Sequence, residues 1–309
     1  MVHKDCDPRC TGKCNKKRLT PAPTAEKGCD PRCTGRCSKK NASISPFESL
    51  PPIVAIAENL PPTTAPVKNE DIGDTKPDGQ IALLKPGEIK FVIMDLDGVV
   101  LDIETVYQWV IEDLASTYGI PAKDVQHIID LQDEETAKKL CADYNLTISP
   151  QDFMTEFRNT SIKHLANTPL MPGVEKLMDF FLENNISVAV ASTSNEEAFK
   201  LKTQKHTAFF RKFSHIVLGG SDPEVDARKP SPKIYQVCGS RFPSNPDPKT
   251  VLVLEDTADG VVAARGAQMN AVWFPNKYMN KENNPGALAV LDSIDAFDPK
   301  QFGLPSIKR

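Results

Sequence analysis

FVIMDLDGVVLD, residues 91–102, is the stretch that decides the fold. Its first four residues, Phe91–Met94, are all apolar, which is typical of a strand buried on both faces of a parallel sheet. The run stops at Asp95 and Asp97, and Gly98 follows where the chain must turn sharply. Ligands bind beyond the carboxyl ends of strands in open α/β sheets, so this carboxylate pair marks a candidate site. A strand end capped by acidic turn residues is the alternative interpretation.

Further apolar runs with the length of buried strands recur along the chain, and helical patterns separate them. These runs are Ile186–Ala191, Ile216–Leu218, Val251–Leu254 and Ala271–Phe274. The alternation of strand and helix predicts an α/β fold, a doubly wound parallel sheet with a Rossmann-like core.

The segment after the first strand contains helical patterns and no strand. An amphipathic stripe over Tyr107–Tyr118 ends at Gly119, and two further helical stretches cover Val125–Leu131 and Glu134–Tyr144. Ser149 stands as an N-cap before a proline and an acidic third residue. Roughly 60 residues of helix are too many for one strand-to-strand crossover, and they predict an inserted helical domain.

These patterns define the expected domains. We expect an α/β core at 88–103 and 169–309, with a helical cap at 104–168 inserted into it. Residues 1–87 hold 12 of the 26 prolines and a single Phe, Tyr or Trp residue, Phe47. Because such a segment cannot bury a core, we predict a disordered arm.

The arm is basic and repetitive. Residues 1–40 carry 11 Lys and Arg against 4 Asp and Glu, whereas the rest carries 26 against 37. The 12-residue segment 6–17 returns at 29–40 with ten identical positions, and the two copies hold six of the eight cysteines. An acidic partner or a metal ion is a possible ligand of this arm, and a solvated tail is the simpler interpretation.

Polar side chains follow the later strands. Ser192 and Thr193 stand at one strand end before a helix, where they suit either a phosphate group or simple N-capping. Glu255 and Asp256 follow another strand, and Lys229 precedes a proline ahead of a helix. Taken alone, that lysine reads as a surface residue.

Together these residues predict one site, because the carboxyl ends of parallel strands meet at one sheet edge. Asp95, Asp97 and Asp256 offer hard oxygen ligands of the kind that Mg²⁺ prefers. Ser192 and Lys229 add hydrogen-bond donors and a positive charge. This combination suits a phosphoryl group.

Other partners are not indicated for the core. No apolar segment of the signal-peptide type follows Met1, and no run approaches the ~18 apolar residues of a membrane span. We therefore expect a cytoplasmic monomer whose core binds neither membrane nor nucleic acid.

Four motifs resemble those of the haloacid-dehalogenase-like hydrolases: DLDGVVLD, VAVASTSN, RKPSP and VLVLEDTADG. The resemblance covers about residues 88–309 and implies the family's Rossmann-like core and helical cap. The segments LMPGVEKL, FFRKFSHIVLG, DPEV, CGSRFP and FGLPS are similar to the pseudouridine-5'-phosphatase group and to the related glycerol-phosphate phosphatases.

The resemblance implies a role for each site residue. Asp95 is the expected nucleophile, which forms an aspartyl-phosphate, and Asp97 is the expected general acid and then base. Three residues are expected to hold the phosphate: Ser192, Thr193 and Lys229. Asp95, Asp256 and the carbonyl of Asp97 are expected to hold Mg²⁺, with Glu255 behind these ligands.

Two positions depart from the family pattern, which usually has glycine at both. Arg228 precedes the motif lysine, and Gln268 stands at the end of a helix. Neither departure changes an expected catalytic residue. A phosphoglucomutase-like mutase and a non-catalytic binding protein that works through its cysteine arm remain alternatives to a phosphatase.

Overall fold

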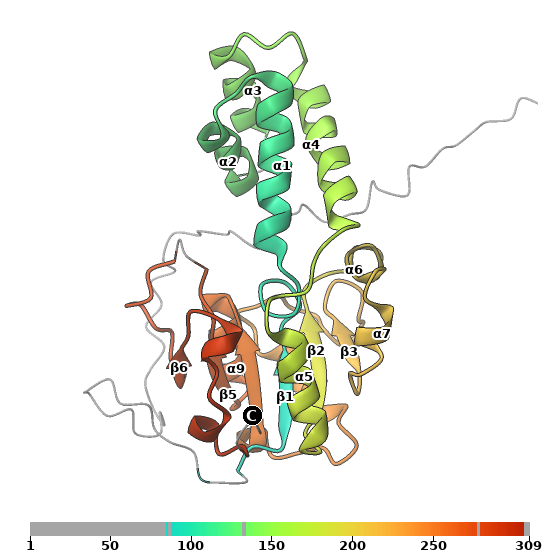
Figure 1. Ribbon diagram of the computed structural model, residues 1–309, viewed down its shortest axis with the longest axis vertical. Helices are drawn as coiled ribbons and strands as arrows, with labels where there is room; N and C mark the ends of the chain where they lie inside the picture. The colour runs from blue at the N-terminus through green and yellow to red at the C-terminus, as the bar shows by residue number, and fades with distance from the viewer. Residues whose placement is uncertain (1–84, 86–87, 132–133, 277–278, 306–309) are drawn as a thin grey trace, which may run out of the picture. The chain divides into compact units, whose positions relative to one another are not determined.

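The structure of the chain is a computed structural model that describes residues 85, 88–131, 134–276 and 279–305 (Figure 1). The chain divides into two units, Met1–Pro46 and Phe47–Arg309, and every described residue belongs to the second. The predictions for the arm, with its cysteine repeats at 6–17 and 29–40, lie outside the described residues. Within the described part, no helix combines the length and the apolar character that a membrane crossing requires.

A six-stranded parallel sheet forms the centre of the fold, in the order β3-β2-β1-β4-β5-β6 (Figure 1). The strands are β1 Phe91–Met94, β2 Ser187–Ser192, β3 Ile216–Leu218, β4 Val251–Glu255, β5 Asn270–Trp273 and β6 Ala289–Val290. The first strand is central, and strands are added on both sides of it, so the predicted doubly wound α/β fold is confirmed.

Pairing shifts two of the predicted strands by one residue. β2 runs from Ser187 to Ser192, because Ser192 still pairs with Leu218 of β3. β5 begins at Asn270, which pairs with Leu252 of β4. Strand β6 was not predicted, since two residues carry no readable period.

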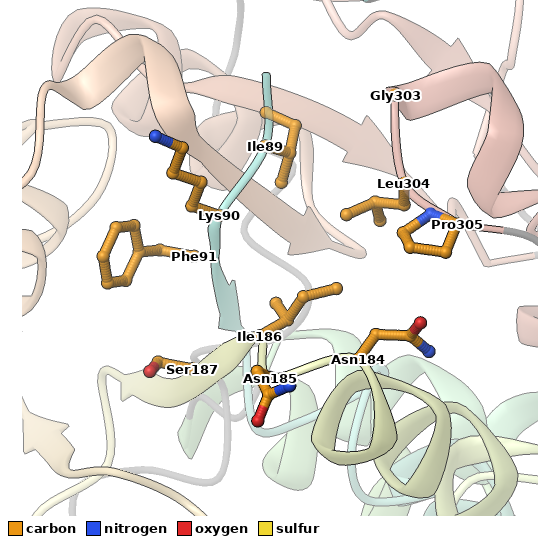
Figure 2. A pocket seen from close by; sticks show the side chains of 10 residues that line it. All are labelled: Ile89, Lys90, Phe91, Asn184, Asn185, Ile186, Ser187, Gly303, Leu304 and Pro305. Atoms are coloured by element: carbon orange, nitrogen blue, oxygen red, sulfur yellow. The ribbon is translucent and has the colours of Figure 1, made fainter. Parts of the chain in front are cut away.

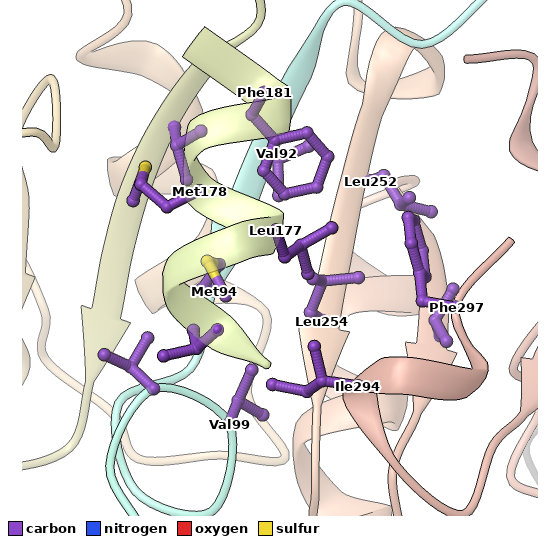
Figure 3. Close-up of a cluster of buried hydrophobic side chains, with 14 of the residues drawn as sticks. Val92, Met94, Val99, Leu177, Met178, Phe181, Leu252, Leu254, Ile294 and Phe297 are labelled. Carbon is purple, nitrogen blue, oxygen red and sulfur yellow. The ribbon is translucent and has the colours of Figure 1, made fainter. Parts of the chain in front are cut away.

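Side chains of the central strands alternate between two hydrophobic layers. Val92 and Met94 of β1 belong to one buried cluster, and Ile93 between them belongs to the other. On the first face, α5 (Val174–Glu183) packs Leu177 and its neighbours against β1 and β4 (Figure 3). On the second face lie α8 (Lys233–Ser240) and α9 (Ala258–Gly266). Burial on both faces explains why these strands are continuously apolar.

Four helices separate β1 from α5: α1 Ile103–Tyr118, α2 Ala122–Leu131, α3 Glu134–Asp143 and α4 Pro150–Leu165 (Figure 1). Most of their buried apolar residues form a separate cluster around Phe153 and Phe157, and a smaller cluster lies where α1 begins and α4 ends. Gly119 ends α1 in the left-handed conformation at φ 64°, as predicted. The Ser149 hydroxyl accepts the Asp152 N–H at 3.1 Å and caps α4, also as predicted. The exact division into cap and core stays a prediction.

The remaining helices are short. They are α6 Glu196–Thr203, α7 Thr207–Phe210 and the 3₁₀ segments Pro248–Thr250, Ile294–Ala296 and Pro299–Phe302. The end of α6 contacts the segment that leaves α4. Gln204 donates to the carbonyl of Ala166 at 3.1 Å, and a ring nitrogen of His206 lies 2.8 Å from the carbonyl of Thr168.

The small-residue pattern of the sequence predicts a helix over Gly260–Met269, but helix α9 covers Ala258–Gly266. It starts earlier because the Thr257 hydroxyl accepts the Gly260 N–H at 3.1 Å and caps it. It ends earlier because Gln268 adopts φ 62°, which breaks the helical repeat. The residue that replaces the family's usual glycine therefore occupies a conformation that favours glycine.

We predict that Gln268→Gly stabilises the protein. Relief of the left-handed conformation is expected to raise the free energy of unfolding by about 0.5 to 1 kcal/mol. Gln268 is exposed, so the substitution leaves no cavity. Urea unfolding of both proteins measures the change, and a lower stability for the glycine variant would contradict it.

Candidate active site

The structure brings Asp95, Lys229 and Glu255 into direct contact. Asp95 follows β1, and its N–H donates to the carbonyl of Leu254 on β4, which fixes the residue beside the end of that strand. The Lys229 ammonium lies 2.5 Å from Asp95 Oδ1 and 2.5 Å from Glu255 Oε1. All three side chains are almost completely buried. The lysine that reads as a surface residue in isolation therefore stands in the interior.

Glu255 is held from several sides. The Tyr235 hydroxyl donates to its Oε1 at 2.5 Å, while the N–H and hydroxyl of Thr257 each donate to its Oε2 at 3.0 Å. Burial alone would raise the pKa of the Glu255 carboxyl, but Lys229 and these hydrogen bonds bring that pKa below its ordinary value. Glu255 is thus a fixed anion that orients Lys229 toward Asp95.

Asp256 lies against the turn that follows β1. Gly98 has φ +86°, and a Cβ on it would lie only 2.2 Å from Asp256 Oδ2. The glycine is needed both for its conformation and because the carboxylate approaches its backbone so closely. The predicted meeting of these two strand ends is therefore present.

Asp97 has a neighbour that the sequence analysis missed. The Lys202 ammonium, on α6, lies 2.5 Å from Asp97 Oδ2 and 2.8 Å from the Ser194 hydroxyl. Lys202 is only 7% exposed. A lysine in a charged helix usually points to solvent. The one signal in the sequence for the inward side chain of Lys202 is its i, i+3 spacing from Phe199, which is half-buried.

Ser192 and Thr193 stand at the end of β2, as predicted. The N-cap of α6 is Asn195, whose side chain accepts the Ala198 N–H at 2.8 Å, so capping does not use the two hydroxyls. Ser192 is 1% exposed, and its oxygen accepts the Ser194 N–H at 3.1 Å. That acceptor role leaves the hydroxyl hydrogen of Ser192 available for donation.

Asp95 and Asp256 both have raised pKa values. Burial, aided by the charges of Glu255 and Asp97, raises the pKa of Asp95 to about 7, although Lys229 opposes the shift. Burial and the neighbouring carboxylates also raise the pKa of Asp256 well above its usual range. Tyr107 of α1 extends the site toward the helical insert: burial and the charges of Asp97 and Asp256 raise the pKa of its hydroxyl.

A divalent cation fits this set of groups. Four carboxylates face only two ammonium groups among the contacts described above. No three Asp, Glu, His or Cys side chains of the described ranges form a metal-binding group by themselves. The expected ligands need only two side chains, Asp95 and Asp256, because the third is a backbone carbonyl.

A cavity of about 590 Å³ lies elsewhere, at the start of the strands (Figure 2). It is lined by Ile89, Lys90, Phe91, Asn184, Asn185, Ile186, Ser187, Gly303, Leu304 and Pro305. Phe91 and Ser187 begin β1 and β2, whereas Asp95 and Ser192 stand at the opposite ends of these strands. The cavity contains none of the predicted site residues and is not the candidate active site.

The fold and site together define a hydrolase with a Rossmann-like core. Residues 92–274 match the family model described as haloacid dehalogenase-like hydrolase. A probable pseudouridine-5'-phosphatase of Drosophila melanogaster is 34% identical over 221 residues, which are 71% of this chain and 96% of that protein. The (DL)-glycerol-3-phosphatase 2 of Arabidopsis thaliana is 32% identical over 229 residues, 71% of this chain and 93% of that protein.

This chain belongs to the haloacid dehalogenase-like hydrolases. The predicted resemblance is confirmed, and so is the prediction of an enzyme of the phosphatase type. The crystal structure of a putative beta-phosphoglucomutase from Thermotoga maritima superposes with a TM-score of 0.56 and 22% identity, covering 66% of this chain and 94% of that one. At that identity the match supports the fold alone.

We predict that Gly98→Ala damages the site more than its backbone strain alone would. The substitution is expected to cost about 2 to 4 kcal/mol of stability, because the new methyl group overlaps the Asp256 carboxylate in addition to straining the backbone. Gly119→Ala is the matched control: φ is +64° there, and a Cβ would meet nothing within 4 Å.

The control should lose only about 1 kcal/mol and keep full activity. Chemical unfolding and phosphatase assays of the two variants make the comparison. Equal losses of stability and activity would refute the close approach of Asp256 to the turn.

Proposed function

We propose that this protein is a Mg²⁺-dependent phosphomonoesterase that works through an aspartyl-phosphate on a small phosphorylated metabolite. The observation that carries the proposal is the buried Asp95 at the end of β1, 2.5 Å from the Lys229 ammonium. A carboxylate held beside a fixed cation at this sheet edge is suited to accept a phosphoryl group and to have the added charge neutralised.

The residues divide the work as follows. Asp95 attacks phosphorus through one carboxylate oxygen, and Lys229 neutralises charge on the phosphoryl oxygens while Glu255 keeps it in place. The Ser192 hydroxyl donates to a phosphoryl oxygen, with Thr193 beside it. Asp97 gives a proton to the leaving alcohol and later takes one from the attacking water.

The metal ion is assigned to three ligands: the carboxylates of Asp95 and Asp256 and the backbone carbonyl of Asp97. The chemistry that Mg²⁺ supplies when bound is neutralisation of phosphate charge. This assignment agrees with the raised pKa values of both carboxyls, since a nearby cation would favour their charged forms.

We propose pseudouridine 5'-phosphate as the substrate, with glycerol phosphate second and other sugar phosphates after it. The proposal draws on the similarity to the two phosphatases named above, which cover most of their own length. We further propose that the insert at 104–168 acts as a cap that selects the leaving alcohol. Tyr107 supports this role, because it joins the insert electrostatically to Asp97 and Asp256. Arg228 is exposed beside Lys229 and would favour dianionic substrates.

We predict that Asp95→Asn abolishes phosphate release from p-nitrophenyl phosphate by the full-length protein. The amide cannot act as the nucleophile, so the rate should fall at least ~10³-fold. EDTA should inhibit the wild type, and added Mg²⁺ should restore it. Asp179→Asn is the control, because Asp179 is exposed on α5 and pairs with Lys212 at 2.6 Å. Unchanged activity of the Asp95 variant would rule out the mechanism.

We predict a preference for pseudouridine 5'-phosphate over uridine 5'-phosphate of at least ~10-fold in kcat/KM, which corresponds to about 1.4 kcal/mol of transition-state discrimination. A phosphate-release screen with Mg²⁺ across nucleotides, sugar phosphates and glycerol phosphates makes the measurement. A smaller ratio would leave a phosphatase with a different substrate. Isomerised sugar phosphate in place of free phosphate would indicate a mutase.

A further inference from the structure

Lys202 is a buried charged residue that the mechanism above leaves without a role. Its ammonium group contacts two side chains, Asp97 Oδ2 at 2.5 Å and the Ser194 hydroxyl at 2.8 Å. The Ser194 hydroxyl also lies 3.4 Å from Asp97 Oδ2. The three side chains come from separate segments: the turn after β1, the end of β2, and α6. Their meeting is thus a product of the tertiary fold.

The contacts treat the two oxygens of Asp97 differently. Oδ2 is held by Lys202 and Ser194, whereas Oδ1 is buried and has no hydrogen-bond partner among the residues that the structure describes. Contacts at one oxygen restrict the rotation of the carboxylate, and no described hydrogen-bond partner competes with a reacting group for its other oxygen.

We propose that Lys202 is a positioning residue, which anchors Oδ2 of Asp97 so that Oδ1 serves as the proton donor and acceptor of the reaction. This inference rests on the proposed phosphatase function. When the bond between phosphorus and the leaving oxygen breaks, the proton on Oδ1 passes to that oxygen and the alcohol departs. When water attacks the aspartyl-phosphate, Oδ1 takes a proton from the water, and the bond between phosphorus and Asp95 breaks to free its carboxylate.

A purely stabilising ion pair is a weaker explanation. Burying an ammonium and a carboxylate costs desolvation energy that their attraction only partly offsets, so an apolar side chain at position 202 would serve stability as well or better. Lys200 shows what an ordinary lysine of the same helix does: it is exposed and pairs with Glu196 at 2.6 Å. The inward lysine therefore points to a functional requirement at Asp97.

Two substrates that differ in their need for a proton test the proposal. p-Nitrophenolate is a good leaving group and departs without general-acid help, whereas the alkoxide of glycerol 3-phosphate requires it. In the full-length protein with Mg²⁺, Lys202→Met should lower kcat/KM for glycerol 3-phosphate by about 100-fold, but for p-nitrophenyl phosphate by less than about 5-fold. Lys200→Met is the matched control and should match the wild type on both.

A second measurement separates positioning from folding and from substrate binding. The rate of phosphate release from glycerol 3-phosphate is measured under single-turnover conditions in Asp97→Asn and in the double variant Asp97→Asn with Lys202→Met. The second substitution should lower this rate by less than about 2-fold further, because the effects of residues that act as a unit are not additive. Equal losses on both substrates with a lowered Tm, a rise in KM alone, additive losses, or no loss would each overturn the role of Lys202. If the wild type released phosphate from neither p-nitrophenyl phosphate nor glycerol 3-phosphate, the proposed function would be overturned instead.

Discussion

The contact of Lys229 with Asp95 and Glu255 is the interaction on which the site depends. Three charged groups are buried at one sheet edge, where each alone would pay a large desolvation cost. One cation shared between two anions reduces that cost but still leaves Asp95 with a raised pKa. Glu255 accepts further hydrogen bonds from Tyr235 and Thr257, whereas the side-chain partner described for Asp95 is Lys229. This difference supports the role proposed for Asp95 as the group that reacts.

The sheet supplies the precision for this arrangement. β1 and β4 are paired in register from Phe91 with Val251 to Met94 with Leu254, so the residues that follow them are also fixed side by side. Hydrophobic layers on both faces hold the strands, and neither layer needs the polar residues at their ends. The apolar side chains of the strands supply stability, and the strand ends hold the residues proposed for the chemistry.

The sequence was informative where a short pattern determines the structure. The apolar run before Asp95, the N-cap at Ser149 and the glycine at position 119 are local signals, and all three were confirmed. The meeting of Asp95, Glu255 and Lys229 followed from strand topology together with family motifs. Strand ends were less predictable, because pairing with a neighbour decides whether Ser192 or Asn270 still belongs to its strand.

Lys202 shows why the rest of the site was not predictable. Its neighbours in sequence are typical of a solvated helix face, and its partner Asp97 lies 105 positions away. Only the tertiary placement of α6, whose Phe199 packs against the first hydrophobic cluster, turns the Lys202 ammonium inward. The same helix leads into Gln204 and His206, which contact the segment leaving α4 at Ala166 and Thr168. Helix α6 and the residues that follow it therefore contact both Asp97 and the base of the helical insert, a connection that exists only in three dimensions.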